Sequence, residues 1–309
     1  MSSDDTLFVI VPYFNFLNYK SGLVNLNWFI RNLSLYNNVE IVLVEGYNSK
    51  DEMLPDLSNK LYKHIKLHVP HTLWVKENLI NIGVRALPSD WKYISWIDRD
   101  IMFCNPNWVT ESISKLQDFD LIQPWKECLF LNNKHEHESI DFGEWSLADS
   151  FLAHSFCSVQ YNKKNKIEFN SKIFSHPGQA WCMTRKLYNK IGKIYEYNIV
   201  GGGDGDMMWC LMGDMLNLKV INNHMYKYLL NLKDVNVSYI DGLIMHYDHG
   251  KLSKRLYLAR NDIMSKHKYN PDVHLCYTDE GVIKFTEKGN IMAKDIRDYF
   301  VYRQEDEDV

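Results

Sequence analysis

The sequence predicts an α/β fold in which a mostly parallel central sheet is flanked by helices. Continuous apolar runs of strand length occupy residues 7–13 and 39–44, as expected for parallel strands that are covered on both faces. Between them, residues 23–35 carry apolar side chains at helical spacing, so the chain opens with a β-α-β unit. A later apolar strand, residues 93–97, ends at two carboxylates, and ligands of open α/β sheets bind at such strand ends.

The other predicted elements follow from apolar periodicity and from the residues that interrupt it. In the first half they are a strand at 66–69, a helix at 76–86 ended by Pro88, a helix at 108–116, and a strand at 120–123 ended by Pro124. Residues 126–167 are polar and aromatic without a clear period, so we expect a loop-rich insertion there, either a lid or a variable excursion. Regular patterns return near residue 174, with a helix at 186–191, a glycine loop at 201–206 leading into a helix from 207, an apolar stretch at 238–250 and a helical run at 251–260.

Composition excludes some classes of function. The chain has 309 residues, a formal net charge of -4 and a pI near 6.3, so it lacks the basic excess of a general nucleic-acid binder. The first residues are acidic where a signal peptide would be basic, and the apolar run near the start is too short to span a bilayer. We therefore expect a cytoplasmic protein with no membrane span and no nucleic-acid partner.

The strongest chemical signal is Asp98-Arg99-Asp100 at the end of the predicted strand 93–97. The pattern alone is weak, because two aspartates one residue apart occur often by chance. Its place at a strand end favours a ligand-binding site over a strand end that is merely exposed to solvent. Carboxylate oxygens at this place suit a divalent cation that holds a phosphate. We expect Asp100 to bind the metal directly, while Asp98 binds the ribose or reaches the metal through water.

Two histidines follow the apolar stretch near residue 240. A lone histidine is more often structural, but His246 and His249 stand beside Gly250, whose backbone can approach a ligand closely. A mixed carboxylate and imidazole set suits Mn²⁺ better than Mg²⁺. Lys251, Lys254, Arg255 and Arg260 follow and can neutralise a diphosphate nearby.

The loop Gly201-Gly202-Gly203-Asp204-Gly205-Asp206 opens a helix. The loop can also have a purely structural role, as a flexible connection in which an aspartate caps the helix. For Asp206 this structural role is a serious alternative. For Asp204 we favour a general base, because the three glycines before it let a substrate hydroxyl come close.

In this order the motifs resemble metal-dependent glycosyltransferases of the GT-A fold, a Rossmann-like type, and in layout the group of beta-1,4-galactosyltransferases and bacterial family-2-like enzymes. The resemblance runs from about residue 6 to 260. It rests on the first strand with Pro12, Tyr13 and Asn15, on Glu45, on the segment with Lys76 and Asn81, on Asp98 to Asp100, on Gly178 and Trp181, on Gly202 to Asp204, and on His249 with Arg255. The family's loop often reads Glu-Asp where this chain has Gly203 before Asp204, so either Asp204 or Asp206 is left as the base.

The resemblance implies transfer of a sugar from a nucleoside-diphosphate donor, with a UDP-sugar expected, to a hydroxyl of a glycan, glycoprotein or small-molecule acceptor. Inversion is expected and retention stays open. Mn²⁺ or Mg²⁺ would be held by Asp100 with His249 or His246, and by Asp98. Trp181 and Trp145 are candidates for stacking on sugars, although tryptophan is more often core.

We expect one domain over 1–302, with a nucleotide-binding half at about 6–125, an acceptor half at about 170–265, and a disordered acidic tail at 303–309. Two alternative functions remain open. One is a metal-dependent nucleotidyl- or phosphotransferase, and the other is an inactive GT-A domain that only binds.

Overall fold

The computed structural model describes residues 5–55, 57, 61–131, 151–166, 175–218, 222–247, 252–257 and 259–306. Within them the chain forms a seven-stranded sheet, a five-stranded sheet and a two-stranded hairpin. The strands are β1 (Leu7–Phe14), β2 (Val39–Tyr47), β3 (Lys63–His68), β4 (Tyr93–Ile97), β5 (Ile101–Phe103), β6 (Leu121–Gln123), β7 (Glu127–Phe130), β8 (Phe151–Ser155), β9 (Ser175–His176), β10 (Ala180–Thr184), β11 (Val237–Tyr239), β12 (Leu243–His246), β13 (Leu275–Tyr277) and β14 (Ile283–Phe285). The α-helices are α1 (Lys20–Leu33), α2 (Lys76–Arg85), α3 (Trp108–Lys115), α4 (Phe156–Lys164), α5 (Arg185–Ile191), α6 (Gly203–Met212), α7 (Asn223–Leu232), α8 (Asp262–Lys266), α9 (Pro271–His274) and α10 (Ala293–Tyr302).

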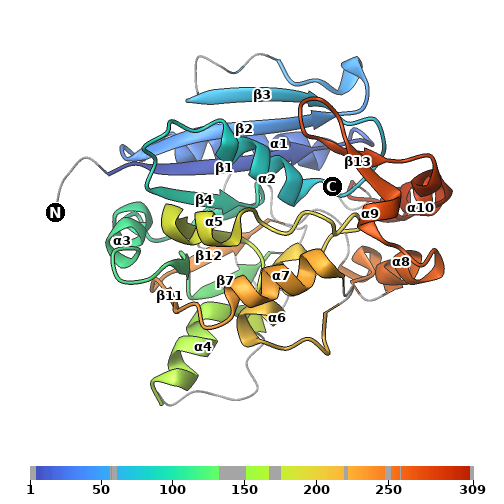
Figure 1. Cartoon of the computed structure of the whole chain (residues 1–309). Coiled ribbons are helices and arrows are strands. Elements are labelled where there is room, and N and C mark those ends of the chain that lie inside the picture. The colour runs from blue at the N-terminus through green and yellow to red at the C-terminus, as the bar shows by residue number, and fades with distance from the viewer. Residues whose placement is uncertain are drawn as a thin grey trace.

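The large sheet has the strand order β11-β6-β10-β4-β1-β2-β3 (Figure 1). Strand β1 pairs in parallel with both β2 and β4, and β2 pairs in parallel with β3. Strand β10 runs antiparallel to β4 and β6, its two neighbours. The predicted α/β class with a mostly parallel central sheet is therefore confirmed.

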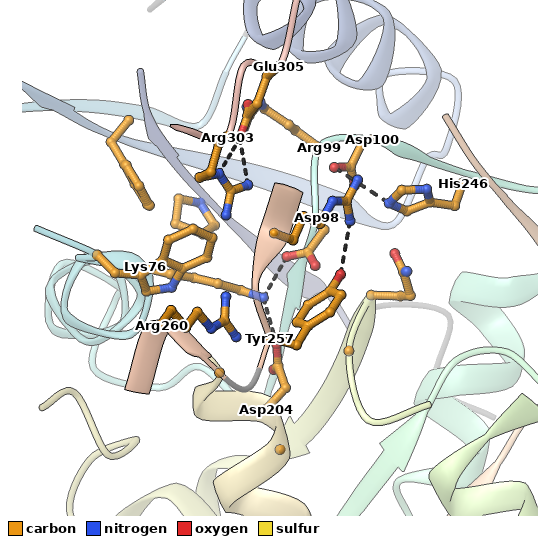
Figure 2. A pocket seen from close by; sticks show the side chains of 18 of the residues that line it. Lys76, Asp98, Arg99, Asp100, Asp204, His246, Tyr257, Arg260, Arg303 and Glu305 are labelled. Atoms are coloured by element: carbon orange, nitrogen blue, oxygen red, sulfur yellow. Dashed lines mark hydrogen bonds and ion pairs between the residues drawn. The ribbon is translucent and has the colours of Figure 1, made fainter. Parts of the chain in front are cut away.

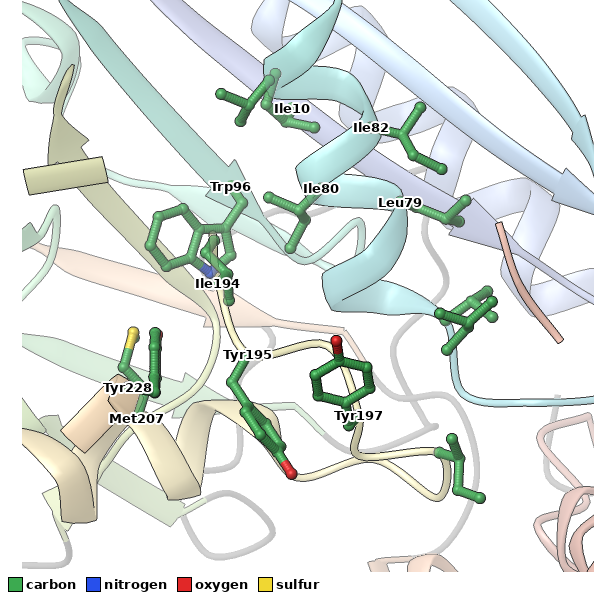
Figure 3. Close-up of a cluster of buried hydrophobic side chains, with 14 of the residues drawn as sticks. Ile10, Leu79, Ile80, Ile82, Trp96, Ile194, Tyr195, Tyr197, Met207 and Tyr228 are labelled. Atoms are coloured by element: carbon green, nitrogen blue, oxygen red, sulfur yellow. The ribbon is translucent and has the colours of Figure 1, made fainter. Parts of the chain in front are cut away.

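Side chains of β1 alternate between two apolar layers, as the period of a strand requires. Phe8 and Ile10 pack in the cluster that contains α2 and the segment before α6, whose members are drawn in Figure 3. Leu7 and Val9 pack on the opposite face with apolar side chains of α1 and α3. Helices thus cover both faces, which explains why β1 is apolar along its whole length.

The smaller sheet corrects the expectation of a loop-rich insertion at 126–167. Strands β7 and β8 pair in it as an antiparallel couple, and α4 follows β8 directly. The stretch lacks a clear period because its strands are short and α4 has little amphipathic character. Residues 132–150, including Trp145, lie outside the described residues.

The C-terminal segment corrects a second expectation. Helix α10 carries Ile296, Tyr299 and Phe300 on its buried side. Residues 303–306 of the expected disordered tail are ordered against the fold, since Arg303 is 7% and Glu305 8% exposed, and residues 307–309 lie outside the described residues. The Asp306 carboxylate accepts hydrogen bonds from backbone N–H groups in the first turn of α1, at 2.6 and 2.9 Å, so the segment is attached to the N-terminal half.

None of the helices in the described part of the chain is long and apolar enough to cross a membrane.

Candidate active site

A cavity of about 810 Å³ opens beside the carboxyl ends of β1 and β4. Pro12 and Asn15 reach it from the end of β1, and Asp98, Arg99 and Asp100 from the end of β4. Figure 2 shows the charged side chains that converge there. The two strands lie side by side in the sheet, so both deliver their last residues to one edge, where ligands of α/β sheets bind.

Lys76, the first residue of α2, connects the carboxylates of Asp98 and Asp204, which lie far apart in the sequence. Its Nζ lies 2.6 Å from Asp98 Oδ1 and 2.8 Å from Asp204 Oδ2 (Figure 2). Burial alone would lower the pKa of Lys76, but the carboxylates of Asp204, Asp98 and Glu77 raise it above its ordinary value. Lys76 is therefore a permanent cation that fixes the distance between the strand end and the glycine loop.

The Asp98 side chain is partly exposed, and its partial desolvation by the surrounding protein raises its pKa to about 6. Lys76 opposes the shift, whereas Asp204 and Asp100 add to it. Its backbone N–H donates to the Gln179 carbonyl at 2.7 Å, which holds the strand end against the segment before β10. Gln179 has a φ of +80°, a rare conformation for a residue with a side chain, and such strain is typical of functional sites.

Asp100 and His246 form a second pair on the other side of the cavity. The Asp100 Oδ2 and His246 Nε2 atoms lie 3.8 Å apart, and both side chains are buried. The backbone fixes this approach, because β5 and β12 pair with Ile101 opposite His246 and Tyr247 N–H donates to the Asp100 carbonyl at 2.7 Å.

A divalent cation fits between these two donors. Oxygen and nitrogen ligands lie about 2.1 Å from such ions, so a separation of 3.8 Å suits two ligands of one ion, and a carboxylate with an imidazole suits Mn²⁺. Over the described ranges, no cluster of three or more His, Cys, Asp or Glu side chains could hold a metal ion. The predicted further ligand His249, like Lys251, lies outside the described residues.

The glycine loop separates the two candidate bases. Gly201 and Gly202 have φ values of +87° and +96°, which favour glycine, and they turn the chain so that α6 begins at Gly203. Asp204 then lines the cavity, whereas Asp206 is fully buried and its Oδ2 accepts a hydrogen bond from Asn198 Nδ2 at 2.6 Å. The structure therefore presents Asp204 to a ligand and places Asp206 in the core.

The presence of glycine at position 203 has a steric cause that the sequence does not reveal. A Cβ atom at this position would lie 2.3 Å from Glu77 Oε1. Glu77 is buried, and burial together with Asp204 raises its pKa to about 8 although Lys76 lowers it. A protonated Glu77 beneath the loop thus occupies the space that any larger residue at 203 would need.

Predicted site residues divide into those that line the cavity and those that do not. The lining includes Pro12, Asn15, Lys76, Asp98, Arg99, Asp100, Gly178, Gly202, Asp204, His246 and Arg255. Tyr13, Glu45, Asn81, Trp181, Gly203 and Asp206 are buried outside it.

The residues outside the lining have internal partners. Asn81 Nδ2 donates to the Ile194 carbonyl at 2.8 Å, and Glu45 accepts from the Leu54 N–H at 2.6 Å. Trp181 donates to the Pro177 carbonyl at 2.7 Å and is fully buried in the sheet, so it is a core residue and not a platform for a sugar. Asn81, Glu45 and Trp181 thus have structural roles. Sequence patterns alone do not distinguish such a role from ligand binding.

Sequence reasoning missed several residues of the lining. Phe300, Arg303 and Glu305 contribute to it, as do Trp74 and His176, which lie within the segments that carry the resemblance but were not predicted as site residues. A signal for Arg303 exists, because Ile296, Tyr299 and Phe300 define a buried helical stripe and 303 is the next position on it. Because acidic residues follow Arg303, the segment was predicted to be a disordered acidic tail and not a continuation of that stripe.

His176 lies on the cavity wall as a neutral imidazole. Burial lowers its pKa to about 4, although Asp204 opposes this shift. Its Nδ1 accepts the Gly178 N–H at 3.0 Å, so Nε2 carries the proton. The segment from His176 to Gly178 therefore presents a neutral donor close to Asp204.

Comparison with protein-family profiles finds no match, and a sequence search of curated proteins finds none either. Among solved structures, a mannosyltransferase from Pyrobaculum calidifontis in complex with GDP-Man and Mn²⁺ is similar over 96% of this chain and 70% of its own, with 11% identity and a TM-score of 0.47. A Drosophila beta-1,4-galactosyltransferase 7 mutant with manganese, UDP-Gal and xylobiose matches 77% of this chain and 65% of that chain, with 10% identity and a TM-score of 0.39.

A third similar structure belongs to another class of enzyme. The 4-diphosphocytidyl-2C-methyl-D-erythritol synthase of Anaerococcus prevotii matches 77% of this chain and 88% of its own, with 12% identity and a TM-score of 0.38. Glycosyltransferases are thus among the structures that this chain is similar to, as the sequence resemblance predicts.

Proposed function

We propose that the protein is a metal-dependent glycosyltransferase that moves a sugar from a nucleoside-diphosphate donor, with a UDP-sugar expected, to a hydroxyl acceptor with inversion. One observation carries the proposal. A single cavity brings together the carboxylates at the end of β4, the imidazole at the end of β12 and the carboxylate of the glycine loop. The sequence resemblance to GT-A enzymes names the same three motifs.

Asp204 is the group proposed to take the proton of the acceptor hydroxyl. Its Oδ2 lines the cavity beside Gly178, where a Cβ atom would lie 3.9 Å away, so a substrate can approach it closely from that side. As the acceptor oxygen bonds to the anomeric carbon, the bond from that carbon to the diphosphate breaks, and the proton passes to Asp204. Lys76 holds the Asp204 carboxylate in place at 2.8 Å.

The leaving diphosphate belongs on the opposite side of the cavity. A divalent ion bound by Asp100 and His246 would neutralise the developing negative charge there. Arg255 lines the same cavity and adds a cation for the phosphates. Asp98 follows β4, and the Arg99 guanidinium lies 5.5 Å from the centre of the Tyr13 ring in β1; these two side chains are proposed for the nucleoside.

The test uses the intact chain with a panel of nucleotide sugars, with and without Mn²⁺. We expect one donor to raise the melting temperature only when Mn²⁺ is present, because ligands that bind the folded state stabilise it. Asp100→Ala should abolish this shift, and Asp241→Ala, on an exposed loop, should keep it. An unchanged shift in Asp100→Ala would contradict the metal assignment.

Product analysis distinguishes the chemistry. Release of the nucleoside diphosphate with a glycosylated acceptor supports the proposal, whereas release of pyrophosphate identifies a nucleotidyltransferase. Donor binding without turnover or hydrolysis identifies a binding domain.

A further inference from the structure

Arg260, in the short turn Ala259–Asn261, is a buried cation on the cavity wall. Its side chain is 5% exposed, and its guanidinium has no carboxylate partner among the described residues. Nη1 donates to the Tyr299 hydroxyl at 3.2 Å, and the group lies 5.1 Å from the centre of the Tyr257 ring. Its Nε is buried without a hydrogen-bond partner. A buried cation without a counter-charge is unfavourable, which points to an anionic ligand.

A second unsatisfied donor lies next to it. Trp74 Nε1 is buried and, like Arg260 Nε, has no hydrogen-bond partner in the part of the chain that the structure describes. Both side chains lie against Gly201, since a Cβ atom there would be 3.0 Å from the Trp74 ring and 3.2 Å from Arg260 Nη1. The two donors therefore belong to one subsite on the cavity wall.

The surroundings add positive charge to this subsite. Arg303 lies 5.2 Å from the centre of the Trp74 ring, and its Nη1 also donates to the Tyr299 hydroxyl at 3.2 Å. Glu305 forms an ion pair with Arg303 at 2.5 Å, and no carboxylate within the described ranges forms an ion pair with Arg260. Two guanidinium groups thus meet at one hydroxyl beside a single carboxylate.

The position of Arg260 indicates which substrate carries the anion. Arg260 contacts Gly201, which belongs to the loop that ends in Asp204. In Figure 2, Arg260 lies on the Lys76 side of the cavity, and Asp100 and His246 lie on the opposite side of Asp98. If the diphosphate leaves next to Asp100 and His246, Arg260 is on the side from which the acceptor approaches Asp204.

We propose that Arg260 and the Trp74 Nε1–H bind an oxyanion of the acceptor, so that the acceptor is a hydroxyl compound carrying a carboxylate or a phosphate. This inference rests on the proposed function and names its acceptor class. The guanidinium supplies a charge-assisted hydrogen bond to either anion, and the indole supplies a second donor. The oxyanion in turn gives Arg260 the counter-charge that the chain does not provide.

Calorimetric titration of the intact chain with glucuronate, glucose 6-phosphate and neutral glucose tests this. At least one anionic sugar should bind about tenfold or more tightly than glucose, and the stronger of the two identifies carboxylate or phosphate. Arg260→Gln should lose the preference, and Trp74→Phe should reduce it by a smaller factor because it keeps the ring. Arg297→Gln, which removes an exposed arginine of α10, should leave the preference unchanged.

Two results would overturn the inference. One is an equal affinity of the wild type for all three sugars, and the other is an anion preference that survives Arg260→Gln.

UDP titrated with Mn²⁺ is measured on the same variants, and a loss of UDP binding in Arg260→Gln as large as the loss of the anionic sugar would assign Arg260 to the donor. If Arg260→Gln does not fold, Arg260→Lys replaces it and should retain only part of the preference. Absence of UDP binding in the wild type would contradict the proposed function, whereas the sugar titrations report on Arg260 alone.

Discussion

Two groups of charges line the cavity, and they differ in whether the chain itself balances them. Lys76 lies within 2.8 Å of the carboxylates of Asp98 and Asp204. Arg260 has a tyrosine hydroxyl and an aromatic ring as partners of its guanidinium, and it forms no ion pair with a carboxylate of the described residues. The first group therefore holds Asp98 and Asp204 in place before any ligand binds, whereas we infer that the second group is completed by a ligand.

The largest expected effect separates the two aspartates of the glycine loop. Asp204→Asn should lower turnover by about 10³-fold, because it removes a general base and keeps the shape of the side chain. Asp206→Asn should lower the melting temperature instead, since Asp206 is bonded to Asn198 inside the core. Turnover and thermal unfolding of both variants are measured, and a normal turnover in Asp204→Asn would remove it as the base.

The comparison of the two charge groups is tested directly by removing each cation. Lys76→Met should destabilise the fold by about 3 kcal/mol, because it leaves two carboxylates facing each other without their shared cation. Arg260→Met should leave the ligand-free stability unchanged or raise it, because its cation has no counter-charge. Denaturant unfolding measures both, and equal losses in the two variants would mean that Arg260 is structural. Lys92→Met, at an exposed ion pair with Asp5, is the control for loss of a lysine.

The steric role of Gly203 gives a smaller effect. Gly203→Ala should destabilise the protein by about 2 kcal/mol, because the added Cβ would lie 2.3 Å from Glu77 Oε1 and the loop must shift. Glu77→Ala removes the obstructing atoms, so the double variant should lose less stability than the sum of the single ones. Strict additivity in this double-mutant cycle would show that Glu77 is not the obstacle.

The smallest effect is a dependence of stability on pH that comes from Glu77. Its pKa in the folded protein is raised to about 8 from the ordinary 4.5, so between these values the folded state binds more protons than the unfolded state. Stability should then fall as pH rises through this window, by about 1 kcal/mol per pH unit near neutrality.

Glu77→Gln should flatten this slope, and Glu111→Gln, at an exposed position of α3, should not. Unfolding free energies between pH 6.5 and 8 provide the measurement. A wild-type stability that rises with pH across this range, with the same slope in Glu77→Gln, would contradict the raised pKa.

Much of the first half of the fold follows from the sequence. β1, β2, β4 and α2 were predicted within a few residues, because long apolar runs and helical spacing reflect burial on both faces of one sheet. β7, β8 and α4 were not predicted, because short strands and a weakly amphipathic helix leave little periodicity. Asn81 and Glu45 were predicted at the site from the family resemblance. A buried polar residue looks the same in sequence whether its partner is a ligand or, as for Asn81, the Ile194 carbonyl.

The sequence alone predicts that the strand before Asp98 and Asp100 is buried and ends at two carboxylates, and that a glycine loop with an aspartate lies further along. These features are local, and local residues determine them through side-chain period and backbone freedom. Only the tertiary structure decided that Asp204 and not Asp206 faces the cavity, that Lys76 connects Asp204 to Asp98, and that Arg303 completes the wall beside Arg260. Each of these facts depends on contacts between segments far apart in the chain, and the pairing of distant charges leaves no periodic trace in the sequence.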